Sequence, residues 1–243
     1  MLNTIQSELI KLKKNKMILV GTIIVLVLPI FIIIKDLFLS SPPDTYAEWI
    51  LGICVVNFIS LPIISGFIIT CLVQREYQEH TIVNMLTAPV SRNTFVLTKL
   101  VIWFIWYLIM LVLVEAIVIL GYWIIYPTSF DTDGIKMIIQ ILTIFGLSNF
   151  IASIHLLWIT IIQKKLFYPS ILGAMGFTVI LIAGANTSLE MMMLASIVPW
   201  SASSVISIGE PSTLYLIISI SSIVISGALG LLLSLYSFMR QDQ

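Results

Sequence analysis

Long apolar runs separated by shorter polar segments dominate the pattern of this chain. Six of the runs have about the twenty residues that a helix needs to cross a hydrocarbon core ~30 Å thick. They cover Met17–Ile34, Ile50–Val73, Leu100–Ile125, Ile135–Ile162, Leu166–Ala185 and Leu214–Met239. Backbone groups in lipid must find their hydrogen bonds within the segment, so each run is predicted to be a transmembrane helix.

The composition supports the same interpretation. Hydrophobic residues make up 59% of the chain and charged residues only 10%, whereas a soluble domain is about one quarter charged. We therefore predict an all-α integral membrane protein with six transmembrane helices, organised as a single domain over residues 1–243. The net charge is zero, which favours no particular charged partner, and we expect no binding to nucleic acid.

Residues 1–16, ahead of the first run, have an amphipathic pattern. Four aliphatic residues recur there at helical spacing beside basic neighbours: Leu2, Ile5, Leu9 and Leu12. This pattern predicts an interfacial helix that lies on the inner leaflet. A frayed basic tail is the alternative.

Residues 186–212, between the fifth and sixth runs, contain an interrupted apolar stretch. Pro199 and several serines break it, and neither half is long enough to cross the bilayer. We predict a short re-entrant helical element that dips into the outer leaflet and lines a cavity. A plain outer loop is the alternative.

The basic residues set the orientation. If the amino terminus is cytoplasmic, ten of the twelve Lys and Arg residues fall on the inner side: Lys11, Lys13, Lys14, Lys16, Arg75, Arg92, Lys99, Lys164, Lys165 and Arg240. Only Lys35 and Lys136 fall outside, so the positive-inside rule predicts that both termini are cytoplasmic. Six aromatic residues are interpreted mostly as interfacial anchors: Trp103, Trp106, Tyr122, Trp123, Tyr126 and Trp200.

Motifs for soluble-type catalysis and metal binding are missing from the sequence. It has no GxxxxGK[ST] loop for a nucleotide, no HExxH, no CxxC and no nucleophile elbow. His80 and His155 lie too far apart in the predicted topology for a metal centre, and Cys54 and Cys71 are predicted to be apolar packing residues. We expect this chain to have no catalytic residue, no metal ligand and no cofactor of its own.

The longest polar interruption, residues 75–99, separates the second and third runs. Three apolar residues at helical spacing give it one hydrophobic face: Ile82, Met85 and Leu86. Glu76 and Glu79 flank the start of this short helix, and Pro89 ends it. We interpret the segment as a helix on which a soluble motor pushes, and which moves both neighbouring spans. An ordinary solvated loop is the alternative.

The same segment resembles the second intracellular segment of ABC-2 type permeases. Over residues 74–100 the chain reads QREYQEHTIVNMLTAPVSRNTFVLTKL. The family pattern is an acidic residue, Gly-Thr, an apolar pair, Pro-x-Ser-Arg, and a Lys at the start of the third span. The matching residues here are Glu76, Thr81, Met85, Leu86, Pro89, Arg92 and Lys99, and His80 replaces the usual Gly.

The resemblance extends over the whole layout, from the amphipathic start through six spans to a re-entrant element before the last. The opening SELIKLKKNK also resembles the family's Glu-Leu-x-Lys before the first span. Within the family, the chain looks most like permease subunits for lantibiotic immunity and bacitracin export, which implies a bacterial cell membrane.

The resemblance implies partners. A dimeric ATPase subunit, which binds ATP and Mg²⁺ in place of this chain, is expected to receive the helix around Glu79–Leu86. The residues implied in this coupling are Glu76, Glu79, Thr81, Ile82, Met85, Leu86, Pro89 and Arg92. A second permease subunit, identical or a sister, is implied as well, together with a peptide substrate.

Glu115 is the one acidic residue predicted deep in a span. An ionisable group there costs about 2.5–3.5 kcal/mol on insertion scales, so it is expected to face protein or water. Counted from the inner ends, Glu115 and Asn149 lie roughly 24 and 21 Å deep on adjacent spans. This predicts a hydrogen bond from Glu115 to Asn149 or Ser148. Two roles stay open, a contact for a cationic peptide and a structural bond between helices.

The predicted function is export of an amphipathic peptide antibiotic from the membrane, conferring immunity or resistance. A permease for another hydrophobic drug, a lipid or an ion is an alternative in the same class. An intramembrane enzyme or a membrane scaffold without transport is the alternative in a different class.

Overall fold

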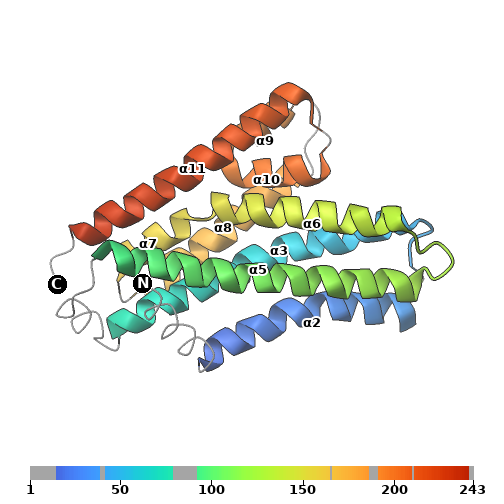
Figure 1. The fold of residues 1–243 in the computed structure, drawn as a ribbon, viewed down its shortest axis with the longest axis horizontal. Helices are drawn as coiled ribbons and strands as arrows, with labels where there is room; N and C mark the ends of the chain where they lie inside the picture. Colours follow the sequence, from blue (N-terminus) through green and yellow to red (C-terminus); the bar gives the residue numbers. More distant parts are fainter. Residues whose placement is uncertain are drawn as a thin grey trace.

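The structure is a computed structural model that describes residues 15–38, 42–78, 92–164, 166–185, 191–209 and 211–240. The regular elements in these ranges are helices (Figure 1). They are α2 (Lys16–Phe38), α3 (Tyr46–Gln78), α5 (Arg92–Ile125), α6 (Thr132–Ala152), α7 (His155–Gln163), α8 (Tyr168–Ala185), α9 (Met192–Ile197), α10 (Pro199–Ile208) and α11 (Thr213–Met239). The predicted all-α fold is confirmed.

Six spans within the described residues are long and apolar enough to cross a membrane. They are α2, α3, α5, the α6–α7 pair, α8 and α11. Five of them contain a whole predicted run, and α8 begins at Tyr168, two residues into the run predicted from Leu166. The chain is therefore a multi-pass membrane protein. The predicted interfacial helix over residues 1–16, apart from its last two residues, and the predicted coupling helix both lie outside the described residues.

Two of the spans, α3 and α5, extend well past their apolar runs at the ends that face each other. Helix α3 continues past Val73 to Gln78, and α5 begins at Arg92 rather than at Leu100. The added turns contain polar residues that are buried against the rest of the bundle, including Glu76. A prediction from hydropathy ends the span at such polar residues. In the structure the helix continues, because these side chains find partners inside the protein.

The fourth span is interrupted by a turn at Ser153 and Ile154 between α6 and α7. Helix α11 packs directly on this turn. A Cβ added at Gly227 would lie 2.6 Å from Ile151 Cγ2, and one added at Gly230 would lie 2.8 Å from the His155 backbone nitrogen. Glycine at these positions is what permits the close approach.

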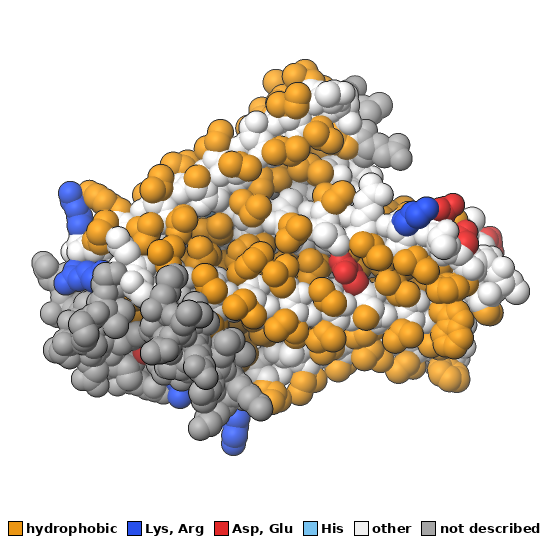
Figure 2. Space-filling view, viewed as in Figure 1, with side chains coloured by type: hydrophobic (Ala, Val, Ile, Leu, Met, Phe, Trp, Pro, Cys, Tyr) orange, Lys and Arg blue, Asp and Glu red, His pale blue; other side chains and the backbone are white. Residues whose placement is uncertain are grey.

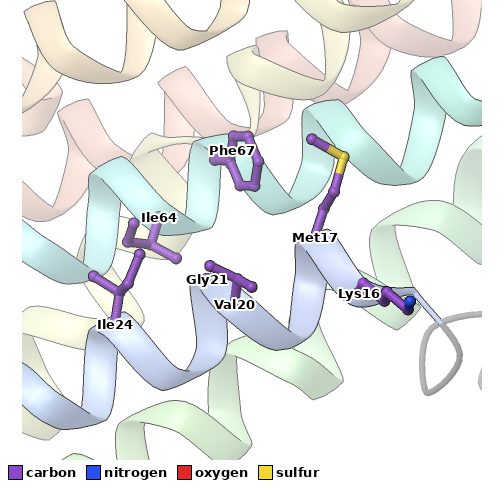
Figure 3. Close-up of a pocket in the computed structure, with 7 residues that line it drawn as sticks. All are labelled: Lys16, Met17, Val20, Gly21, Ile24, Ile64 and Phe67. Atoms are coloured by element: carbon purple, nitrogen blue, oxygen red, sulfur yellow. The ribbon is translucent and has the colours of Figure 1, made fainter.

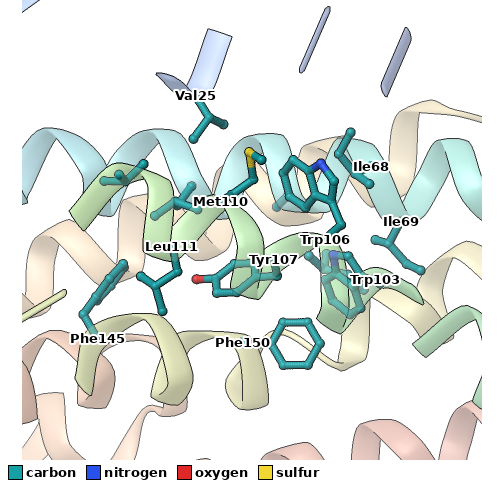
Figure 4. Close-up of a cluster of buried hydrophobic side chains, with 14 of the residues drawn as sticks. Val25, Ile68, Ile69, Trp103, Trp106, Tyr107, Met110, Leu111, Phe145 and Phe150 are labelled. Carbon is teal, nitrogen blue, oxygen red and sulfur yellow. The ribbon is translucent and has the colours of Figure 1, made fainter. Parts of the chain in front are cut away.

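The core of the bundle is rich in aromatic side chains. Figure 4 shows Trp103, Trp106 and Tyr107 of α5 at the centre of the buried cluster. Trp103 Nε1 donates to Ser65 O at 3.1 Å and to Ser65 Oγ at 2.9 Å. Because Trp103, Trp106 and Tyr122 are buried, their assignment as interfacial anchors is wrong: their ring N–H and O–H groups find partners inside the protein.

The end of the bundle near the α5–α6 connection is also held by polar contacts. The Tyr126 hydroxyl donates to Pro43 O at 2.7 Å. Burial, followed by the nearby Asp36, Glu48 and Asp44 carboxylates, raises the pKa of Tyr126 above its ordinary value. The phenol therefore keeps the proton that it donates.

Charged side chains gather at the two ends of the molecule, and hydrophobic side chains cover most of the face between them (Figure 2). At one end, Lys16 and Arg75 border the same hollow, and Arg92 contacts Met239. We call this the coupling end, because the connection from α3 to α5 leaves the bundle there. These basic residues lie together at one end of the bundle, as predicted. Which side of the membrane this end faces remains a prediction.

Residues 191–208 of the predicted re-entrant region form the two short helices α9 and α10. Val198 between them is extended, and Pro199 begins α10, as its missing N–H allows. Helix α10 lies against α8, where Ser204 Oγ donates to Leu181 O at 2.9 Å. Their depth in the membrane remains a prediction.

The contact between α3 and α8 generates a stability prediction. A Cβ at Gly66 would overlap the Cβ of Ala174, whereas a Cβ at Gly52 on the same helix would meet nothing within 4 Å. We expect Gly66→Ala to lower the free energy of unfolding by about 1–3 kcal/mol through overpacking. The matched control Gly52→Ala should be neutral or slightly stabilising. Thermal midpoints in mild detergent check both, and equal midpoints for the two variants would contradict this packing.

Candidate coupling site

The candidate site is the base of residues 79–91, the connection between α3 and α5. Six of the predicted coupling residues lie outside the described residues: Glu79, Thr81, Ile82, Met85, Leu86 and Pro89. The structure describes the other two, Glu76 and Arg92, which stand on the two helices that enter and leave the connection.

An ion pair joins these two helices inside the protein. Lys99 Nζ on α5 lies 2.9 Å from Glu76 Oε1 on α3, and the two side chains are 1% and 4% exposed. A buried charge is tolerated only when it is paired. The two ends of the connection are therefore bonded to each other, and parting them would break a buried ion pair.

Sequence reasoning named Glu76 and Lys99 separately but missed their pairing. Each residue lies on the bundle side of the predicted coupling helix, at or just beyond the edge of an apolar run. The signal that could have revealed the pair was the position of the two residues. One is acidic and one is basic, and they lie at the facing ends of consecutive antiparallel spans.

The first turns of α5 are also tied to the end of α11. Arg92 Nη1 donates to Met239 O at 2.7 Å, where a cation favourably meets the last carbonyls of a helix. Phe95 stacks on Phe238 with ring centroids 4.7 Å apart. The Phe95 ring also lies 5.4 Å from Lys99 Nζ, so the ion pair and the α11 contact form one continuous cluster.

The last turns of α3 are tied to the start of α8. Gln74 Nε2 donates to Leu166 O, just before α8. One turn deeper in the bundle, the hydroxyls of Thr70 and Ser170 lie 2.7 Å apart, and Gln163 Nε2 at the end of α7 donates to Ser170 Oγ at 2.6 Å. Helices α3, α5, α8 and α11 thus meet at the base of the connection, and α7 joins them one turn deeper.

Two hollows border α2 near the coupling end. One, of about 380 Å³, is lined by residues of α2 and α3 together with Asn15 and Phe167. The other, of about 360 Å³, lies between α2 and α3 and is lined almost wholly by apolar residues (Figure 3). Lys16 and Met17 line both. Among the described residues, neither hollow combines the acid, base and nucleophile that a catalytic site needs.

Metal ligands do not gather in the part of the chain that the structure describes. No group of three or more His, Cys, Asp or Glu side chains is close enough to hold an ion there. Cys54 and Cys71 are both buried with free thiols.

The structure separates the two polar residues predicted to line a substrate path. Thr143 Oγ1 donates to Glu115 Oε1 at 2.7 Å, and Asn149 Nδ2 donates to the Tyr107 hydroxyl at 3.4 Å. Ser148 bonds to carbonyls of its own helix. The predicted bond from Glu115 to Asn149 or Ser148 is therefore wrong. Glu115 is half-buried, whereas Asn149 is 1% exposed.

The error comes from the register between α5 and α6. A Cβ at Gly146 would lie 2.7 Å from the Leu111 side chain, in the same register as the Glu115–Thr143 pair. Counting depth from Lys99 and Gln163 assumed two continuous helices that end at one level. However, a turn follows α6, and α5 begins earlier than assumed. The residues of α6 that face Glu115 therefore differ from those that the depth count predicted.

The comparison with known families gives one match. Residues 4–184 match the family described as ABC-2 family transporter protein. The matched range includes the Glu76–Lys99 pair and the whole of the connection above it. No curated protein matches the chain.

The ion pair predicts a non-additive effect on stability. Lys99→Met takes the ammonium away from a buried carboxylate, and we expect it to lower the free energy of unfolding by about 3–5 kcal/mol. Adding Glu76→Leu removes the other charge and should restore most of that loss. Thermal midpoints of both single variants and the double variant measure the coupling.

A control comes from the opposite end, where Lys136 and Asp133 form a pair at 3.0 Å that is 73% and 78% exposed. Asp133→Ala should change the midpoint little. If the double variant is no more stable than Lys99→Met alone, the pair does not hold the two helices.

Proposed function

We propose that this chain, which belongs to the ABC-2 transporter family, is the permease subunit of a bacterial exporter of amphipathic peptide antibiotics of the lantibiotic or bacitracin type. It would remove such peptides from the membrane and so confer immunity or resistance. The single observation that carries the coupling part of the proposal is the buried Glu76–Lys99 pair at the base of the connection.

The proposed mechanism starts at residues 79–91. A partner ATPase, dimeric and carrying ATP and Mg²⁺, docks on the helix around Glu79–Leu86. Closure of the ATPase dimer displaces that helix. Because Glu76 and Lys99 are bonded to each other, the displacement reaches α3 and α5 together, and Arg92 passes it on to α11. The permease then switches between inward and outward access.

The proposed orientation follows from the charges. With the coupling end in the cytoplasm, both termini are cytoplasmic and the acidic α5–α6 connection faces outward. The α9–α10 pair then lies in the outer half of the membrane as the re-entrant element. Two permease subunits, identical or one with a sister, would complete the transporter.

The cargo part of the proposal has two supports. One is the resemblance of residues 74–100 to peptide-antibiotic permeases. The other is Glu115, which is half-buried between α5 and α6 and offers a negative group to a cationic peptide within the membrane. Asn149 on α6 would stabilise the same helix pair through its buried hydrogen bond to Tyr107 on α5.

Docking on the ATPase generates the next prediction. The double change Glu79→Arg with Met85→Asp should abolish co-purification with the ATPase encoded beside this chain, because it reverses a charge and places another on the apolar face. Asp133→Lys with Lys136→Glu, at the other end of the bundle, is the matched control and should co-purify normally. Failure of the wild type to bind any ATPase would refute the permease assignment.

A charge-specific role of Glu115 predicts a separation of activity from stability. Glu115→Gln keeps an acceptor for Thr143 but removes the negative charge. We expect an unchanged thermal midpoint and a loss of most protection against cationic lantibiotics, measured as the inhibitory concentration for cells that express the whole transporter. Thr143→Val should leave protection largely intact. Equal protection by wild type and Glu115→Gln would refute the contact while leaving the permease assignment standing.

A further inference from the structure

The two hollows that border α2 at the coupling end form one groove, which we call the α2–α3 groove. The hollow of about 380 Å³ is lined by Arg75 and Gln78 near the end of α3 and by Lys16 at the start of α2. The hollow of about 360 Å³ lies farther along the same two helices. Lys16 and Met17 line both hollows, so the groove has a charged end and an apolar end.

The walls of the α2–α3 groove are single faces of two helices. On α3 the lining residues recur at intervals of three or four, which places them on one face. They are Ile64, Phe67, Cys71, Arg75 and Gln78. Figure 3 shows the apolar part of the groove between the two helices, with Lys16 at its end. The groove therefore follows the helix axes from the end of the bundle toward its apolar middle.

The apolar part of the groove has nearly the depth of one leaflet. From Lys16 to Ile24, α2 rises about 12 Å, and half of a ~30 Å hydrocarbon core is about 15 Å. Val20 and Ile24 are 54% and 43% exposed, so this part opens toward the outside of the bundle. In a membrane that surface meets acyl chains, and an acyl chain that fills a preformed groove gains dispersion contacts along its length.

The charged end of the groove determines the kind of headgroup. Lys16 is exposed at the start of α2, and Arg75 is half-buried. A guanidinium has five N–H donors, so Arg75 can bond a phosphate oxygen and also keep a contact within the protein. The Met17 amide is already satisfied, because it donates to Asn15 Oδ1 at 3.0 Å. Recognition thus rests on two cationic side chains, which favour a headgroup of net negative charge over a zwitterionic one.

We propose that the α2–α3 groove binds one anionic phospholipid, with its phosphate on Lys16 and Arg75 and one acyl chain along the apolar wall. A soluble phosphate compound would leave the apolar end empty, whereas a lipid fills both ends. The site needs only that the coupling end meets a leaflet, so it is independent of the cargo. Arg75 lies one turn before the end of α3 at Gln78, so the lipid joins α2 to the turns that lead into the connection.

Native mass spectrometry of the purified whole chain measures this binding. Phosphatidylglycerol and phosphatidylcholine with the same acyl chains are titrated separately, and we expect phosphatidylglycerol to bind saturably and more tightly. Lys16→Gln with Arg75→Gln should raise its Kd about thirtyfold, which is roughly fivefold for each cation. Lys164→Gln is the matched control and should leave the Kd unchanged, because Lys164 is exposed and lines neither hollow.

A second pair of variants tests the acyl chain. Val20→Trp fills the apolar end and should weaken the binding of phosphatidylglycerol about tenfold. Leu19→Trp is the matched control, because Leu19 is 53% exposed on the same helix and lines neither hollow. Thermal midpoints without added lipid establish that each variant is folded.

Four results would overturn the proposal. Equal binding of the two lipids would mean that the cations are neutralised by the chain itself, for which Glu8 and Glu79, outside the described residues, are the nearest acids in sequence. Loss of binding in the charge variant but not in Val20→Trp would mean that the site takes a phosphate alone. Loss in Val20→Trp alone would mean unselective contact with acyl chains, and no bound lipid would mean that the groove holds no lipid.

Discussion

One buried ion pair fixes the end of this protein at which α3 and α5 meet. Glu76 and Lys99 stand on consecutive spans and are almost completely shielded from solvent. A buried charge needs a partner, so the two helices cannot part there without losing the bond between Glu76 and Lys99. Residues 79–91 are therefore attached to one joined base rather than to two independent helices. Arg92 ties the same base to α11 and Gln74 ties it to α8, so whatever acts on the connection acts on four spans.

The opposite half of the bundle is built differently. There α11 leaves the side of α6, and the space is filled by the two short helices α9 and α10 rather than by a straight span (Figure 1). Among the residues that the structure describes there, serine hydroxyls and one indole border a groove along α11. Helix α10 is packed there with buried serine and alanine side chains, so small residues rather than charges join the helices of this half.

The sequence predicted the six spans because their apolar runs are long and their interruptions short, and Pro199 correctly indicated two short helices before α11. Hydropathy failed where a polar residue is paired inside the protein. The turns that contain Glu76 and Lys99 were assigned to the polar connection, because a hydropathy value takes no account of a residue's ion-pair partner. Trp103 was placed at a membrane interface because its hydrogen-bond acceptor, Ser65, lies on another helix and cannot be seen in the local pattern. The register of Glu115 was missed because nothing in the pattern reveals the turn at Ser153.

The buried pair predicts that α3 and α5 move as one body when the partner ATPase binds ATP. Pulsed electron spin resonance on the assembled transporter measures this with labels at Gln78→Cys and Asn93→Cys, which are exposed at the ends of the two helices, after Cys54 and Cys71 are replaced. We expect the distance between Gln78 and Asn93 within one subunit to stay constant on ATP binding, while the distance between the Gln78 labels of the two subunits of the proposed transporter changes. A change in the distance within one subunit would contradict it.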